Sequence, residues 1–302
     1  MSIHDLLSEN YITFNDSLNH QIILRNMAVV RARITVLFPV HRIDSFIEEA
    51  VTSIFVQDCP DYEVFFLVDG YCLQDFEASI SRVECSMSSP LPPYLILPFN
   101  SINHLSHKLN VGISLVSSDT EFIARMDSDD VSHASRLRLQ LEFLLNEPSC
   151  GVVGCKVQLV DKNSAIINRI IYPFVQSDAL IRRALPYKNL MCHPALMFRR
   201  SALIEVNGYT YGGRSEDHDL LIRIMLNTAY TFYNLPLTLF SYRRHETQIT
   251  AFKNAIILYS DIASFCLKYF ILTSNLAFLL PLLIYIPLLR RVRKFMNNLF
   301  SC

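Results

Sequence analysis

The stretch "EFIARMDSDDVSHASRLRLQ", residues 121–140, runs from a hydrophobic segment directly into three aspartates, Asp127, Asp129 and Asp130. Neighbouring carboxylates repel one another, so a folded chain keeps them where water solvates them or where a cation neutralises them. An isolated D-x-D-D cluster is equally compatible with a solvated turn whose aspartate caps a helix beginning near 132–135. The surrounding sequence has to separate these two interpretations.

Short apolar runs alternate with amphipathic stretches on both sides of this segment. We expect strands at 34–38, 64–68, 94–97 and 122–126. We expect helices at 44–57, 72–83 and 105–117. The strands are apolar on both faces, which is typical of a parallel sheet with helices on each side. The sequence therefore predicts an α/β fold with a mostly parallel central sheet.

Polar residues follow these strands at the edge where α/β proteins bind ligands, beyond the carboxyl ends of the strands. The ends read Pro39-Val40-His41, Asp69-Gly70 and Asp127-Ser128-Asp129-Asp130. In a D-x-D spacing the two carboxylates point to the same side, so one can ligate a hard divalent cation while the other reaches a ligand hydroxyl or a metal-bound water. The pattern favours a metal site that also binds phosphate.

Other phosphate and metal sites do not fit. If Asp127 were the first position of an EF-hand loop, the sixth would be Ser132 instead of glycine and the twelfth Arg138 instead of glutamate. The chain has only 7 glycines and contains neither G-x-G-x-x-G nor G-K-[ST]. Phosphate groups would therefore be bound through the metal.

A second acidic cluster lies in "SEDHDLLIRI", residues 215–224. If a helix begins near Glu216, Asp217 shares a stripe with the apolar residues three, four and seven positions later and faces inward. Partial desolvation would raise its pKa toward the range of a general base, while the helix N-terminus would restrain the rise. The alternative for Glu216 and Asp217 is an ordinary acidic helix start. For Asp219 we favour an ion pair with Arg223 at i+4.

Composition excludes some classes of function. A formal net charge of -1 and a pI of about 6.7 give no electrostatic reason to expect nucleic acid binding. The 8 cysteines include no C-x-x-C pair, so we interpret them as reduced, packed side chains of a cytosolic domain. Residues 1–20 are polar and acidic where a secretory signal would be basic and then apolar. We therefore expect the catalytic part to be cytoplasmic.

The end of the chain has a membrane-like composition. Residues 269–289 contain no charged side chain and are followed by "RRVRK" at 290–294. A single crossing would put this basic cluster on the outer side, and Pro281 and Pro287 would interrupt the helix. We expect residues 269–294 to lie on the cytoplasmic face of the membrane instead. A buried helix packed on the domain is the alternative.

These features divide the chain into three parts. They are an N-terminal extension at 1–30, an α/β domain at 31–250 and a helical, membrane-associating tail at 251–302.

Eight segments, in order, resemble family 2 glycosyltransferases with the GT-A fold, in particular the bacterial enzymes that build surface polysaccharides. The segments are "ITVLFPVHRIDSFIEEAVTSIFVQ", "FLVDG", "LNVGI", "EFIARMDSDDVSHASRLRLQLEFLLNEP", "GVVGC", "HPALMFRRSALIEVNGY", "SEDHDLLIRI" and "YRRHETQIT".

The resemblance implies roles for the residues that match the family pattern. Val40 and Asp69 would contact the nucleotide base, and Asp127 would lie near the ribose. Asp129 would bind Mn²⁺ or Mg²⁺ on the donor diphosphate, and Asp217 would be the catalytic base.

Other residues matter because they extend or depart from that pattern. Arg243 and His245, in a Y-R-x-H element, would approach the donor diphosphate or the metal, with an exposed histidine as the alternative for His245. The chain reads "VDGYC" where the family has two aspartates. Leu109 stands where many members have an arginine, and Lys108 would take over the donor-binding role of that arginine. "NGY" replaces the usual G-G-Y. His193 belongs either to the acceptor site or to the packing.

The activity implied is inverting, metal-dependent transfer of a sugar from a nucleotide-diphospho-sugar to a hydroxyl of a glycan or lipid-linked glycan. One alternative is a catalytically degenerate GT-A scaffold subunit of a membrane assembly. Another is a sugar-phosphate nucleotidyltransferase, which would carry a glycine-rich loop that "FPVHRIDSF" lacks.

Overall fold

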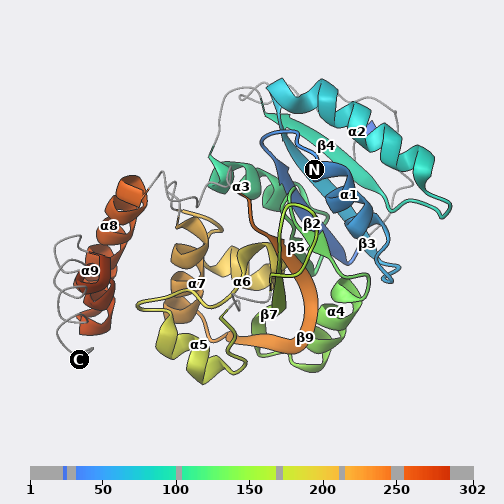
Figure 1. Ribbon diagram of the computed structural model, residues 1–302. Coiled ribbons are helices and arrows are strands. Elements are labelled where there is room, and N and C mark those ends of the chain that lie inside the picture. The colour runs from blue at the N-terminus through green and yellow to red at the C-terminus, as the bar shows by residue number, and fades with distance from the viewer. Residues whose placement is uncertain are drawn as a thin grey trace.

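The computed structural model describes residues 23–25, 32–99, 104–167, 173–210, 215–245 and 255–285. The described strands join in one sheet in the order β1-β4-β3-β2-β5-β8-β7-β9-β6 (Figure 1). They are β1 Ile23–Arg25, β2 Ile34–Val40, β3 Tyr62–Asp69, β4 Tyr94–Phe99, β5 Phe122–Arg125, β6 Val131–Ser132, β7 Cys150–Val160, β8 Met197–Arg199 and β9 Thr231–Arg243.

Helices cover both faces of this sheet. They are α1 Ile47–Phe55, α2 Leu73–Ser86, α3 Leu105–Leu115, α4 Arg136–Asn146, α5 Asp178–Ala184, α6 Arg200–Glu205, α7 Glu216–Asn227, α8 Ala255–Thr273 and α9 Leu280–Tyr285. Short 3₁₀ helices lie at η2 Gly70–Cys72, η3 His193–Ala195 and η5 Leu276–Leu279. The predicted α/β fold is confirmed, and each predicted strand and helix in residues 34–117 forms with shifted ends.

The parallel part of the sheet, β4-β3-β2-β5, explains why its strands are apolar throughout. Val36, Phe38 and Val40 of β2 point into one core with α1, α2 and α4, whereas Leu37 points into a second core with α3 and α7. Every residue of β2 and β3 is buried. A Cβ on Gly112 of α3 would lie 2.8 Å from Leu37, so this glycine permits close packing of the helix on the sheet.

Strand β9 brings the end of the domain back to the aspartate cluster. It runs parallel to β7 and antiparallel to the short β6, with Val131 opposite Ser241 and Ser132 opposite Phe240. Because β6 begins directly after Asp130, this pairing places Arg243 and His245 beside the cluster. The sequence did not predict β6.

The described part of the tail packs on the domain. The Phe265 ring of α8 lies 4.7 Å from the His218 ring of α7, and Tyr269 of α8 donates a hydrogen bond to the Asp219 carboxylate at 2.7 Å. The described part of the uncharged stretch, residues 269–285, contains the end of α8, η5 and α9, with Ser274 in the left-handed region at φ 54°. No helix among the described residues is long and apolar enough to cross a membrane. The basic cluster 290–294 lies outside them.

Candidate active site

The aspartate turn between β5 and β6 is held by a buried arginine. Arg125 Nη2 donates to Asp127 Oδ1 at 2.6 Å, and Arg125 Nη1 donates to the Leu37 carbonyl at 2.7 Å. Arg125 is fully buried, while the Asp127 side chain is 33% exposed. Residues two apart on a strand point to the same side, so the sequence "RMD" contained the signal for this pair. Asp127 is therefore held in place with its carboxylate facing outward.

Asp129 contacts the end of the C-terminal strand. His245 Nε2 lies 2.9 Å from Asp129 Oδ2, and the His245 ring packs on Phe46 with centroids 5.1 Å apart. The His245 side chain is only 6% exposed, so the alternative of an exposed surface histidine is wrong. Burial and the neighbouring charge of Asp127 raise the pKa of Asp129, and His245 opposes this rise.

The third aspartate is structural. Asp130 Oδ1 accepts a hydrogen bond from the Arg243 backbone N–H at 2.8 Å, which fixes β9 to the turn. Asp130 is 1% exposed, and burial raises the pKa of its carboxyl well above the usual value. Asp127 and Asp129 are therefore the carboxylates that remain for a ligand.

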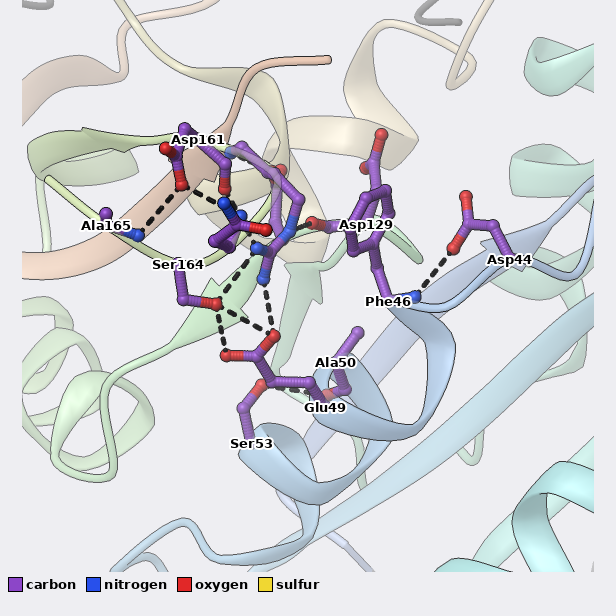
Figure 2. Close-up of polar contacts among 12 residues, drawn as sticks. Asp44, Phe46, Glu49, Ala50, Ser53, Asp129, Asp161, Ser164 and Ala165 are labelled. Carbon is purple, nitrogen blue, oxygen red and sulfur yellow. Dashed lines mark hydrogen bonds and ion pairs between the residues drawn. The ribbon is translucent and has the colours of Figure 1, made fainter. Parts of the chain in front are cut away.

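The Arg243 guanidinium is fully buried behind this turn. It donates to the Asp129 carbonyl at 2.8 Å, to Ser164 Oγ at 3.0 Å and to Glu49 Oε2 at 2.6 Å (Figure 2). It also lies over the Phe46 ring, 4.6 Å from the centroid. Arg243 thus acts on the aspartate turn through the Asp129 backbone, and its contact with a donor remains a prediction.

A buried ion pair lies at the end of the neighbouring strand β3. Lys108 Nζ of α3 donates to Asp69 Oδ1 at 2.7 Å, and each side chain is 3% exposed. The Val40 side chain is fully buried, so any contact of this residue with a base would use its backbone. Burial, followed by the charges of Arg42 and Lys108, lowers the pKa of His41, which lies beside this pair. Lys108 therefore holds Asp69 in place, and its replacement of the family arginine stays a prediction.

The second acidic cluster begins α7, as the sequence predicts. Asp217 Oδ2 accepts a hydrogen bond from Asn189 Nδ2 at 2.8 Å. Burial raises the pKa of Asp217 and, with the Asp217 charge, raises that of Glu216 to about 8. Arg125 and Asp127 also act on the Glu216 carboxyl electrostatically, so the two acidic clusters lie close enough to interact. The structure therefore brings Glu216, which precedes the predicted base, within electrostatic range of Asp127.

Asp219 has the structural role that its spacing indicates. It is fully buried and accepts a hydrogen bond from Arg223 Nε at 2.7 Å. Lys268 and Tyr269 of α8 donate to its other oxygen at 2.8 and 2.7 Å. Burial alone would raise the pKa of Asp219, but these donors lower it below the usual value. Asp219 thus fixes the tail to the helix that carries Asp217.

The model of the family described as "Glycosyl transferase family 2" matches residues 35–206, which is more than half of the 302 residues. The chain belongs to glycosyltransferase family 2. It is 29% identical over 239 residues to the O-antigen biosynthesis glycosyltransferase WbnJ of Escherichia coli, covering 79% of this chain and 89% of that protein. It is 24% identical over 223 residues to the amylovoran biosynthesis glycosyltransferase AmsE of Erwinia amylovora, covering 74% and 79%. The protein is therefore a glycosyltransferase.

Solved structures confirm the GT-A fold of this family 2 glycosyltransferase. The mannosyltransferase PcManGT from Pyrobaculum calidifontis, in complex with GDP-Man and Mn²⁺, superposes with a TM-score of 0.56 at 17% identity, covering 78% of this chain and 64% of that one. TarS 1-349 of S. aureus in complex with UDP gives a TM-score of 0.56 at 15% identity, covering 79% and 65%. The chain thus spans just under two thirds of the length of these structures, and the likeness concerns the fold.

The aspartate turn of this glycosyltransferase fits a divalent ion. Within the described ranges, no three His, Cys, Asp or Glu side chains form a metal-binding group. An ion bound to a diphosphate needs only one or two protein carboxylates, because phosphate oxygens and water supply the other ligands. Asp129 supplies a carboxylate and His245 a nitrogen beside it. A cation would also relieve the repulsion between Asp127 and Asp129 that raises the Asp129 pKa.

Three residues of the site were missed from the sequence. Arg125 lies among apolar strand residues, and Tyr209 lies in the "NGY" turn. Asn189 is 28 residues before Asp217, the residue of α7 to which it donates a hydrogen bond. Only Arg125 carried a local signal, its spacing of two from Asp127. His193, whose role the sequence left open, is 8% exposed and bonded to Tyr209 and Arg125, so it is a packed residue of the site's interior.

Proposed function

We propose that this glycosyltransferase transfers a sugar, with inversion, from a nucleotide-diphospho-sugar to an acceptor hydroxyl in the synthesis of a bacterial surface polysaccharide. The supporting observation is the meeting of two acidic clusters at one end of the sheet. Asp127 and Asp129 follow β5, Asp217 begins α7, and Arg125 acts on carboxyl groups of both clusters. One cluster suits a donor diphosphate and the other suits proton removal.

The donor side would use the carboxyl ends of the first strands. Asp69, held by Lys108, and the Val40 backbone would contact the base, and Asp127 would bind the ribose. Asp129 and His245 would hold Mn²⁺ or Mg²⁺, which when bound neutralises charge on the leaving diphosphate. Arg243 would support this group through the Asp129 backbone.

On the acceptor side, Asp217 would take the proton of the attacking hydroxyl. Its raised pKa keeps it a better base than an exposed aspartate, and the hydrogen bond from Asn189 orients its carboxylate. Attack from the face opposite the diphosphate inverts the anomeric carbon in one displacement and needs no covalent enzyme intermediate. The names of WbnJ and AmsE support a glycan or lipid-linked glycan as acceptor.

A panel of nucleotide sugars tests the proposal. We expect one UDP- or GDP-sugar to raise the melting temperature of the protein when Mn²⁺ is present, because a ligand that binds only the folded state stabilises it. The shift should shrink in EDTA. If the metal never alters the effect of any sugar nucleotide, the metal-dependent donor site is wrong.

We further propose that the tail attaches the enzyme to the cytoplasmic face of the membrane. The described tail exposes large apolar side chains, each between 44% and 70% accessible: Leu267, Ile271, Leu272, Leu276 and Leu280. Phe265 and Tyr269 of α8 pack on α7. The sequence continues without charge to residue 289 and then becomes basic, which suits an anionic lipid surface.

Paired substitutions test this surface. Ile271→Asp combined with Leu272→Asp should weaken binding to phosphatidylglycerol-containing vesicles about tenfold or more, because two apolar side chains are lost from the lipid contact. Ile204→Asp, at an exposed isoleucine of α6, is the matched control and should have no effect. Cosedimentation measures both. Equal losses in the two variants, or no vesicle binding by the parent, would contradict the proposal.

A further inference from the structure

A chain of hydrogen bonds connects α3 to the donor-side aspartate, and it begins at Asn110. Asn110 Nδ2 donates to the Tyr209 carbonyl at 2.6 Å, and the Tyr209 N–H donates to Asn110 Oδ1 at 2.8 Å. Gly208, at φ 61°, brings the backbone so close that a Cβ would lie 2.4 Å from Asn110 Oδ1. Glycine is required there both for its conformation and for space. The "NGY" turn is therefore fixed to α3.

The next step is a shared acceptor on His193. Tyr209 Oη lies 2.7 Å from His193 Nε2, and Arg125 Nε donates to the same nitrogen at 3.3 Å. An arginine can only donate, so Nε2 is unprotonated and the proton of the neutral ring is on Nδ1. The Tyr209 hydroxyl is then the second donor. Burial, followed by the Arg125 charge, lowers the pKa of His193 well below its usual value, and burial raises that of Tyr209.

The last step is Arg125 itself. Its Nε contacts His193, its Nη1 contacts the Leu37 carbonyl and its Nη2 contacts Asp127 Oδ1. The Leu37 and Met126 carbonyls accept from Nη1 at 2.7 and 3.2 Å, and His193 is the acceptor for Nε. Arg125 also acts on Glu216 from the opposite cluster. Arg125 therefore interacts with carboxyl groups of both clusters, and its hydrogen bond holds the Asp127 carboxylate.

We propose that His193 is a positioning residue, a neutral acceptor that with Tyr209 orients Arg125 and through it Asp127, so that the 208–209 turn is coupled to the donor site. The proposal rests on the proposed function in that Asp127 contacts the donor. A direct contact of His193 with acceptor does not suit the geometry, because Nε2 already accepts from two donors and the residue is 8% exposed.

Two substitutions of His193 separate positioning from packing. His193→Gln keeps an acceptor oxygen near the position of Nε2, whereas His193→Leu removes it. We expect His193→Leu to weaken binding of UDP or GDP with Mn²⁺ about tenfold, the scale for a lost hydrogen bond to a charged group. His193→Gln should remain within about threefold of the parent. Calorimetry gives the dissociation constants, and Tyr209→Phe should produce a smaller loss if His193→Leu does not fold.

A double-mutant cycle shows whether His193 acts through Asp127. In an Asp127→Asn background the additional loss from His193→Leu should disappear, because the carboxylate that Arg125 positions is gone. The same tenfold loss in both backgrounds, or no loss in either, would overturn the proposal. Failure of the parent to bind UDP or GDP would count against the proposed donor instead.

A spectroscopic measurement tests the protonation state of His193 in the absence of any sugar nucleotide. The ¹⁵N spectrum of the histidine rings, with His193 assigned by its absence in His193→Gln, should show a neutral ring protonated on Nδ1 at pH 7. An Nε2-protonated ring or an imidazolium could not accept from Arg125 and would refute the inference.

Discussion

Replacing Asp129 with asparagine is expected to abolish sugar transfer and to weaken donor binding only when Mn²⁺ or Mg²⁺ is present. The amide is a poorer ligand for a hard cation than the carboxylate, so the loss is transmitted through the metal. The asparagine retains the size of the native side chain and can still contact His245, so the turn should keep its shape. A fall in transfer of about 10³-fold is the scale for losing such charge stabilisation.

The measurement compares parent and Asp129→Asn by donor binding and by turnover, each with Mn²⁺ and with EDTA. In EDTA the two proteins should bind UDP or GDP equally weakly. Adding Mn²⁺ should increase the affinity for UDP or GDP in the parent but not in Asp129→Asn. Equal turnover of the variant and the parent would eliminate Asp129 as the metal ligand. Weaker binding by the variant in EDTA as well would indicate a direct contact with the nucleotide.

The donor side could be predicted from the sequence because its signals are local. Continuous apolar runs indicate strands buried on both faces, and a parallel arrangement brings their carboxyl ends to one edge. Asp69 and Asp127 lie within two residues of the ends of β3 and β5, so their placement follows directly. The acidic start of α7 could also be predicted from local spacing. Asp217 and Asp219 are two residues apart on the helix, so they point to different sides and contact different partners.

The contacts made by distant segments could not be predicted. The pairing of the two-residue strand β6 with β9 brings His245 beside Asp129, and such a short strand carries no periodicity. Arg243 reads as a cation available to a phosphate, but Glu49, 194 residues away, accepts its hydrogen bond inside the protein. Hydropathy likewise marks 269–289 as apolar without showing that Tyr269 packs on α7. In each case the partner is chosen by the tertiary fold.

Asp217→Asn is expected to leave donor affinity nearly unchanged while lowering kcat about 10²-fold or more, the usual scale for losing a positioned base. The asparagine is isosteric, and its carbonyl oxygen can still accept from Asn189, so the start of α7 should be preserved. Asp75→Asn, at an exposed aspartate in the first turn of α2, is the matched control and should keep its turnover. A collapse of donor binding in Asp217→Asn would mean that this carboxylate has a structural or donor-side role.

The pH dependence gives the same assignment independently. A base must be unprotonated to act, so the rate should rise with pH through the Asp217 pKa, which burial places above the usual value for aspartate. Burial and the charge of Asp217 raise the pKa of Glu216 to about 8, so we expect any change in rate near pH 8 to come from Glu216. Glu216→Gln should therefore leave the low-pH limb of the kcat profile in place and remove any change in rate near pH 8. If Glu216→Gln abolished the low-pH limb and Asp217→Asn did not, Glu216 would be the base.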